Sequence, residues 1–414
     1  IVGTMGLVLA LLFQAVLLPR FGLYFHLLRL DLVAMWLFVV SASIVLFGLR
    51  PVARFAWVWG LLLGVFSLPY YLVVVLFGGG KFAAGAATLL IAGVGTGIAG
   101  GPTLRRGFVG SMSAWVVGFA VLITIAVVFP DSPVRIYQQV PALTAICVVT
   151  VLMYFRARRG VPKRVLDRKV EPLAAHQVWA AVPLVVMVTF CLAVVGLPVA
   201  AGTTVNSGTD AGNLIAGRPL VAPPGWDTAG SRNYQWVERF YGDNAVLVRQ
   251  QLTAVTPDPR FDKLSRPRTV VVDSIVSERP LSFDVYPTRV LYDLTGARLS
   301  PARSVDLGHG VTGEMVSVVD DTLLITWNSL RFVWGDGDRA QLVSIFTVDN
   351  HEPGAPFPQP SDSMVSTLRT LFTLLFRGNA VLDARAPTIK DLELLTEFGR
   401  ALVGAQLDSF GRTR

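Results

Sequence analysis

The sequence predicts a membrane all-α bundle of about seven transmembrane helices, followed by a C-terminal extracytoplasmic α+β domain with a mainly antiparallel sheet. Three observations lead to this fold class. The chain of 414 residues is 53% hydrophobic and only 15% charged, whereas soluble domains are about a quarter charged. Its first 201 residues contain long apolar runs, and the residues after 226 change to short β-type segments.

Seven apolar runs, of 18 to 24 residues, match the ~20 residues needed to cross about 30 Å of hydrocarbon. For the first run a signal peptide is the competing interpretation, but no small-residue cleavage site precedes Pro19. Because Ile1 is not an initiator, we expect further residues before it. The predicted spans are Ile1–Leu18, Leu32–Leu49, Phe55–Phe77, Phe82–Gly101, Phe108–Phe129, Ile136–Phe155 and Val178–Ala201.

A basic run between the last two spans predicts the orientation in the membrane. Cytoplasmic loops are enriched in Lys and Arg, so the run should lie inside and the residues after 202 outside, with the N-terminus inside. The Arg50/Arg54 and Arg105/Arg106 pairs fall on the same side. The basic residues of the run are Arg156, Arg158, Arg159, Lys163, Arg164, Arg168 and Lys169.

Glycine recurs at every fourth position in the fourth span, at Gly93, Gly97 and Gly101. Such a face allows close helix packing in a membrane. The same stretch contains a G-x-G-x-x-G pattern, but a nucleotide site needs a strand before it and a helix after it. We therefore interpret these glycines as packing residues.

The composition changes after Ala201, and residues 202–226 are predicted to form a linker between a transmembrane domain (1–201) and an extracytoplasmic domain (227–414). Four strands separated by turn residues predict an antiparallel meander. They are Met315–Val319, Leu323–Trp327, Arg331–Trp334 and Gln341–Val348. Further predicted strands are Tyr234–Tyr241, Ala245–Thr253, Thr269–Val276, Leu281–Tyr286 and Arg289–Tyr292.

Two C-terminal segments have helical spacing. In Thr388–Leu407 an apolar stripe recurs at three- and four-residue steps, which predicts a helix covering the sheet. Ser363–Arg377 is too short to span a membrane. It is predicted to be either a core helix, which we prefer, or a helix at the membrane surface. The stripe consists of Ile389, Leu392, Leu395, Phe398, Leu402 and Val403.

Charge distribution argues against nucleic-acid binding. The net charge of +8 divides into +11 for residues 1–200 and −3 for residues 201–414, so the outer domain has no basic footprint. Few of the basic residues are Lys, which together with abundant Ala, Val and Gly is typical of an actinobacteria-like coding bias. The sequence has no HExxH, CxxC, Walker A or G-x-S-x-G motif, so we expect neither a metal nor another cofactor.

Two polar clusters of the outer domain are candidates for catalysis. Asp306 with His309, and Asp349 with His351, could each orient an imidazole as a general base. The same compositions are common in turns.

A third candidate is Asp31, in the first external loop beside His26 and Arg29. The layout of several spans and an outer C-terminal domain resembles that of membrane glycosyltransferases using polyprenyl-phosphate sugars. That resemblance implies a catalytic carboxylate in this loop, although the paired acidic signature and the long first loop are missing. An ion pair between Asp31 and Arg29 is the competing interpretation, and the one we prefer.

Our first functional hypothesis is non-enzymatic: an assembly or transport accessory protein of a bacterial cell envelope, in the plasma (inner) membrane. Its outer domain would bind a protein partner or a lipid-like ligand, and the chain would contact membrane lipid. The second hypothesis is the glycosyltransferase using Asp31. An ion pump is disfavoured because the spans contain almost no ionisable residues.

Overall fold

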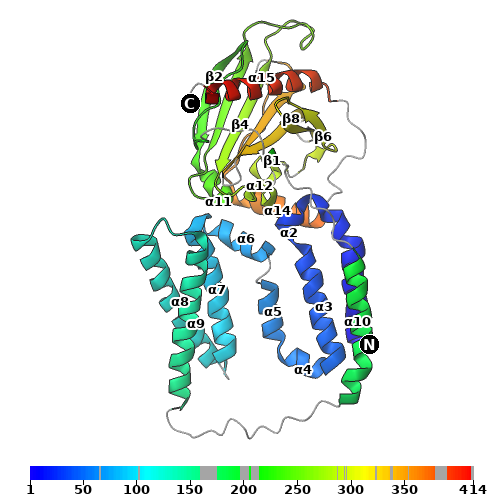
Figure 1. Ribbon diagram of the computed structural model, residues 1–414, viewed down its shortest axis with the longest axis vertical. Coiled ribbons are helices and arrows are strands. Elements are labelled where there is room, and N and C mark those ends of the chain that lie inside the picture. The colour runs from blue at the N-terminus through cyan, green and yellow to red at the C-terminus, as the bar shows by residue number, and fades with distance from the viewer. Residues whose placement is uncertain are drawn as a thin grey trace. The chain divides into compact units, whose positions relative to one another are not determined.

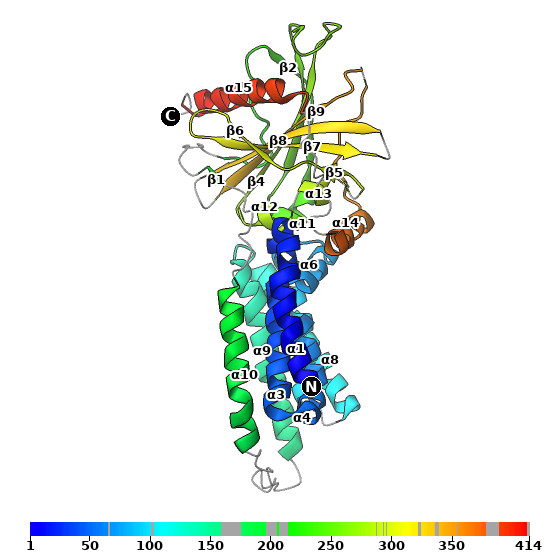
Figure 2. The same ribbon diagram turned by 90° about the vertical axis from the view of Figure 1, so that its right-hand side faces the viewer.

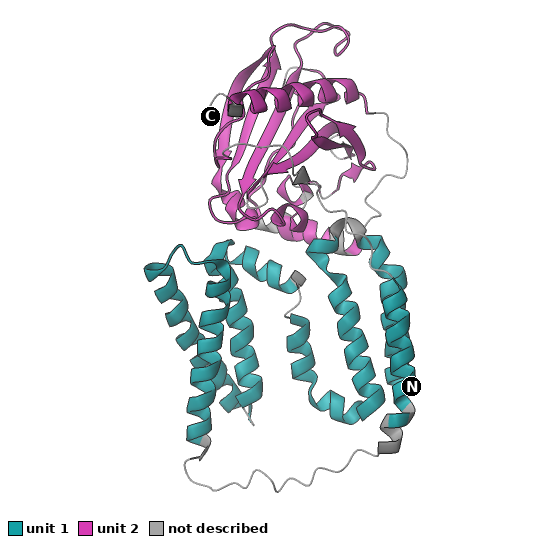
Figure 3. Cartoon of the chain, in the orientation of Figure 1, with its two compact units in different colours: residues 1–200 teal, residues 201–414 magenta. Residues whose placement is uncertain are grey.

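The chain folds into two compact units, residues 1–200 and 201–414 (Figure 3). This computed structural model describes all residues except 65–66, 101–102, 159–174, 196–204, 207–213, 287, 293, 295, 322–323, 336–338, 353, 378–388 and 412–414.

Unit 1 is helical throughout its described residues (Figure 1). It begins with α1 (Val2–Leu12), a π-helical turn η1 (Phe13–Leu17), a 3-10 segment η2 (Leu18–Tyr24) and α2 (Phe25–Leu28). The elements that follow are α3 (Leu30–Phe47), α4 (Leu49–Arg54), α5 (Ala56–Gly64), α6 (Ser67–Leu76), α7 (Gly80–Gly100), α8 (Leu104–Val128), α9 (Val134–Arg158) and α10 (Ala175–Val194).

Among the described residues of unit 1, five helical stretches are long and apolar enough to cross a membrane, which suggests a membrane protein. A sixth is present only if α5 and α6, bent by 61° relative to each other, count as one broken span. The apolar part of α10, Ala181–Val194, is shorter than a span. The predicted apolar helical unit is therefore confirmed, whereas the predicted count of seven is not. The five stretches are Val2–Phe21, Leu30–Phe47, Gly80–Gly100, Leu104–Val128 and Val134–Arg156.

The break between α5 and α6 has a local cause. α5 ends at Gly64, and Pro69 lies in the first turn of α6. Proline has no backbone N–H, so it is tolerated in a first turn but disrupts a helix interior. A continuous helix over residues 55–77 would place Pro69 in its interior, and two shorter helices avoid this.

Unit 2 is built around a nine-stranded sheet with the order β2-β3-β4-β9-β8-β7-β5, in which neighbouring strands are antiparallel. β6 pairs with β7, and β1 pairs parallel with β8. An antiparallel sheet was predicted, and the structure confirms it. The strands are β1 (Val205–Asn206), β2 (Trp226–Tyr234), β3 (Leu247–Ala254), β4 (Thr269–Ser277), β5 (Arg298–Leu299), β6 (Arg303–Asp306), β7 (Thr312–Asp320), β8 (Ile325–Gly335) and β9 (Ala340–Val348).

The predicted four-strand meander is wrong in one place. β8 runs without interruption through Asn328 and Ser329, which were predicted to form a turn. Asn328 is fully buried and donates a hydrogen bond from Nδ2 to Oδ1 of Asp349 at 2.6 Å. Because Asp349, directly after β9, accepts this hydrogen bond, the strand tolerates a buried asparagine.

Three other predicted strands are helical in part. Residues 235–241 form η3 (Gln235–Val237) and α11 (Glu238–Tyr241). The segments predicted as strands around Phe283 and Val290 form α12 (Ser282–Val285) and α13 (Thr288–Leu291). Phe283, Tyr286 and Val290 are all buried, and their three- and four-residue spacing suits short helices rather than strands.

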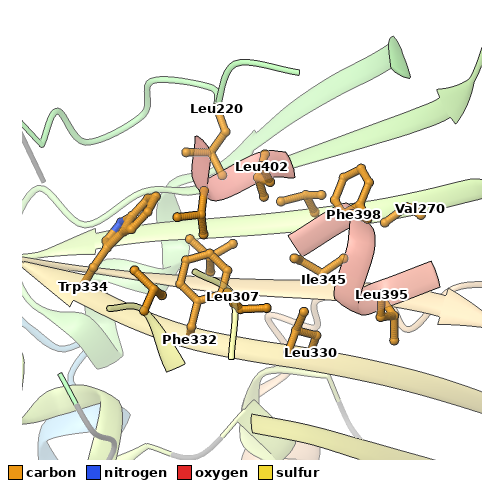
Figure 4. Packing of buried hydrophobic residues seen from close by; sticks show 14 of the residues in the cluster. Leu220, Val270, Leu307, Leu330, Phe332, Trp334, Ile345, Leu395, Phe398 and Leu402 are labelled. Atoms are coloured by element: carbon orange, nitrogen blue, oxygen red, sulfur yellow. The ribbon is translucent and has the colours of Figure 1, made fainter. Parts of the chain in front are cut away.

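The main core lies between the sheet and α15 (Leu392–Gly411), which crosses one face of the sheet (Figure 1, Figure 2). Leu395, Phe398 and Leu402 are buried there, as the apolar stripe predicted (Figure 4). The proposed cap at Thr388 lies outside the described residues. The strands contribute Val270, Val272, Leu330, Phe332, Trp334, Val343 and Ile345.

Two buried glutamines hold an extended segment against one side of this core by hydrogen bonds. The side-chain amide of Gln250 in β3 both accepts from Leu220 N (2.7 Å) and donates to Leu220 O (2.9 Å). Gln406 in α15 does the same with Val221, at 3.0 and 2.7 Å. Each amide therefore satisfies the backbone of an extended segment as a neighbouring strand would.

Candidate functional site

Two cavities lie on the sheet face opposite α15. Leu252 and Val270 point into the α15 core, so Gln251 and Val271, one position away on the same strands, point to the other side. The cavities have volumes of about 590 and 360 Å³. Gln251, Phe357 and Gln359 line both. We call the two cavities together the β3 groove.

The β3 groove also borders β2, which forms one end of the described sheet. Residues 229–232 of β2 line the smaller cavity, and all of them are exposed. An edge strand presents backbone N–H and C=O groups that can pair with an added strand. The groove thus combines a concave floor with a strand edge that pairs with no other described strand.

The opposite wall of the groove is formed by residues 350–352 and 354–359, part of which side chains of the sheet hold in place. Trp327 Nε1 donates to Pro356 O at 2.9 Å. Arg249 donates from Nη2 to Pro358 O at 2.7 Å and from Nη1 to Oε1 of Gln359 at 2.9 Å. These bonds fix residues 356–359, which have no regular secondary structure of their own.

Arg249 is itself held by a buried carboxylate. Its Nε and Nη2 donate to the two oxygens of Asp273, both at 2.8 Å, and the Tyr292 hydroxyl donates to the same carboxylate. Burial raises the pKa of Asp273, whereas the guanidinium and the phenol act in the opposite direction. Burial also raises the pKa of Tyr292 well above its ordinary value. The three groups satisfy one another and leave no free nucleophile.

His351 lies at the other end of the groove in a second network. Its Nδ1 is 3.2 Å from Oδ2 of Asp262, and its Nε2 faces Nη1 of Arg268. Arg268 also donates to Oδ2 of Asp391 at 2.6 Å. Because a guanidinium has only donors, Nε2 must accept and Nδ1 must carry the proton. The lone pair that a general base would use is therefore occupied.

The catalytic residues predicted from the sequence of unit 2 lie in separate places. His351 contacts Asp262, which is far away in the sequence, and not its sequence neighbour Asp349. Asp349 instead accepts a hydrogen bond from Asn328, and its carboxylate lies 3.3 Å from Nζ of Lys390. Asp306 and His309 are exposed in a tight turn. Oδ1 of Asp306 accepts from Gly308 N at 2.9 Å, and His309 has a φ of 53°. This is turn chemistry.

Asp31 lies in the first turn of α3 and pairs with Arg29 through two hydrogen bonds of 3.0 Å. A carboxylate is also favourable at a helix N-terminus, where backbone N–H groups are unpaired. Both observations favour the ion-pair interpretation of Asp31.

The candidate packing glycines of α7 face α8. A Cβ on Gly93 would lie 2.0 Å from Nε1 of Trp115, and one on Gly97 would lie 2.1 Å from Oγ of Ser111. Gly101 lies outside the described residues, as do Arg159, Lys163, Arg164, Arg168 and Lys169 of the basic run. Arg156 and Arg158 form the end of α9.

Sequence reasoning missed the two networks of the β3 groove. A usable signal was present, because Asp273 interrupts the apolar run of β4, and Arg249 is the basic residue of the neighbouring strand β3. A charge at the centre of a buried strand needs a partner, and the two residues are directly opposite in the β3–β4 register. No local pattern reveals that Asp262, Arg268 and Asp391 would meet His351.

Fold and site together define a class: an apolar helical unit that suggests a membrane protein, joined to an antiparallel α+β unit with a groove beside an edge strand. Comparison with protein-family models, with curated proteins and with solved structures found no match. Among the described residues, no three His, Cys, Asp or Glu side chains are grouped as a metal site requires.

Proposed function

We propose that this chain is a non-enzymatic accessory protein of a bacterial plasma membrane, and that its α+β unit binds an extended segment of a protein partner in the β3 groove. In this proposal unit 1 is a seven-span bundle with the N-terminus inside. The broken α5–α6 pair forms one span and α10 forms another, in addition to the five continuous spans. The α+β unit then lies outside the cell.

The uncharged part of the groove lining, next to the β2 edge, carries the proposal. Arg249 is paired with Asp273, and Arg268 with Asp391, and both pairs are buried. The rest of the lining offers amide, hydroxyl and apolar surface, including Gln251, Thr253 and Phe357, together with the charged side chains of Arg232, Arg266 and Glu352. Such a lining, next to the β2 edge, suits an extended peptide that uses backbone hydrogen bonds and small side-chain pockets.

Site-specific photocrosslinking in the native membrane tests the proposal. A benzophenone amino acid replaces the exposed Gln251 in the groove, and the matched control replaces Asp408, which is exposed on α15. We expect a polypeptide adduct at position 251 and none at position 408. An adduct removed by lipid extraction would identify a lipid-like ligand instead, and equal labelling at the two positions would contradict binding in the groove.

The glycosyltransferase hypothesis has less support, because both oxygens of Asp31 are held by Arg29. It predicts that Asp31→Asn abolishes transfer of sugar to the envelope while the protein remains in the membrane, since an amide cannot act as a general base. An unchanged envelope glycan composition in this variant would count against it. Arg29→Gln serves as the control that breaks the ion pair but keeps the carboxylate.

A further inference from the structure

Helix α14 (Met364–Arg377) has one buried side and one exposed aromatic side. Thr367, Thr370 and Leu371 are at most 4% exposed. Phe372 is 51% exposed and Phe376 is 82% exposed. The two phenylalanines are four positions apart, so they lie above one another on the same face. The buried side fixes which face remains outside.

The exposed face is also basic. Arg369 is exposed and precedes Phe372 by three positions, which places it on the same face. α14 contains Arg369 and Arg377 and no acidic residue, although residues 201–414 as a whole have a net charge of −3. The helix is therefore a local basic segment in an acidic unit.

Basic amphipathic helices with aromatic residues on the apolar face are typical of membrane surfaces. In such a position the apolar side chains enter the boundary between headgroups and acyl chains, and the Arg side chains reach anionic headgroups. Two exposed phenylalanines on one helix face are unfavourable in water, because each leaves a large apolar area hydrated.

The chain itself supplies a bilayer for this helix. Val194, the last residue of α10, and Val205, the first of β1, are eleven positions apart. A fully extended residue spans at most ~3.6 Å, so this tether reaches about 40 Å at most. A tether of that length gives α14 a high effective concentration at the membrane that holds the five apolar helices.

We propose that α14 is an interfacial helix that inserts Phe372 and Phe376 into the surface of an anionic lipid bilayer, with Arg369 contacting the headgroups. The proposal concerns a surface separate from the β3 groove and does not depend on the function proposed for that groove. It assigns the exposed aromatic face to lipid and not to a protein partner.

The test uses the full chain in nanodiscs of phosphatidylcholine with phosphatidylglycerol. Cys147 and Cys191 are replaced by Ser, and an NBD fluorophore is attached to Phe376→Cys or, as the control, to Asp408→Cys. We expect NBD at position 376 to emit at a shorter wavelength than at position 408 and to lose at least half of its intensity when spin-labelled lipids are included. NBD at position 408 should not respond.

Two outcomes would overturn the proposal. Water-like, unquenched emission at position 376 would show that the face stays in solution. A shorter emission wavelength without quenching by spin-labelled lipids would show that protein covers it. Phe372→Cys supplies a second probe one turn away, so a local perturbation at position 376 cannot decide the result alone.

Discussion

The ring of Phe398 in α15 meets the indole of Trp226 at the start of β2 edge-on, with centroids 4.8 Å apart and planes at 79°. Edge-to-face aromatic pairs contribute about 0.5–1.5 kcal/mol beyond the area they bury. This pair joins α15, the helix that covers the core, to β2, the strand at the end of the sheet. It therefore holds the helix against the sheet at this side of the core.

Phe398→Ala should lower the free energy of unfolding of residues 201–414 by about 3–5 kcal/mol, because it leaves a cavity under α15. That is a large share of the ~5–15 kcal/mol available to a typical domain. Urea unfolding of the purified unit measures it, with the exposed Asp408→Ala as control. An unchanged midpoint would mean that the Phe398 face of α15 does not carry the core.

Gly93→Ala should destabilise the helical unit, because the new methyl would lie 2.0 Å from Nε1 of Trp115. Overpacking of this kind costs about 1–3 kcal/mol. Gly60→Ala in α5 is the matched control, since a Cβ there has no atom within 4 Å. Thermal scans of the detergent-solubilised proteins should show a lower melting temperature for Gly93→Ala only. Equal melting temperatures of the two variants would argue against a close α7–α8 contact.

Asp262 predicts a pH dependence in acid. Burial raises its pKa, but the hydrogen bonds from Leu264 N and the Arg266 side chain outweigh burial and lower the pKa below its usual 3.8. The unfolded chain then binds the proton more readily, so this stabilisation is present above about pH 4 and is lost as the pH falls through the folded-state pKa.

Asp262→Asn should therefore lower the melting temperature of unit 2 at pH 6, because an amide is a weaker acceptor than the carboxylate for the hydrogen bonds from Leu264 N and Arg266. It should also reduce the drop in melting temperature between pH 6 and pH 3. Asp408→Asn, at an exposed position, controls for the change in net charge. A variant whose melting temperature falls as steeply as that of the native chain would refute the linkage.

The orientation in the membrane can be tested by cysteine labelling in a background without Cys147 and Cys191. A cysteine at the exposed Thr256 should react with an impermeant maleimide in intact cells. A cysteine at Ala157, beside the basic run, should react only after the membrane is opened. The reverse pattern would place the α+β unit in the cytoplasm.

The sequence predicts those parts of this fold that depend on local periodicity. The apolar helices and the stripe of α15 follow from spacing alone, and both are present. The uninterrupted course of β8 through Asn328 depends on a neighbour in space, Asp349. The same holds for the groove, where Arg249 meets Asp273 and His351 meets Asp262 across 24 and 89 positions of sequence. Contacts of that range leave no periodic pattern.

The position of α15 in the chain has a consequence for biosynthesis. β2 is complete at Tyr234, but the core closes only when Val403 is available, 169 residues later. At ~5–20 residues per second, translation of that stretch takes roughly 10–35 s. From their own synthesis until that of α15, the apolar strands β4 and β9 have no helix to cover them, and exposed apolar strands are prone to aggregation. Unit 2 is therefore most open to aggregation before α15 has been synthesised.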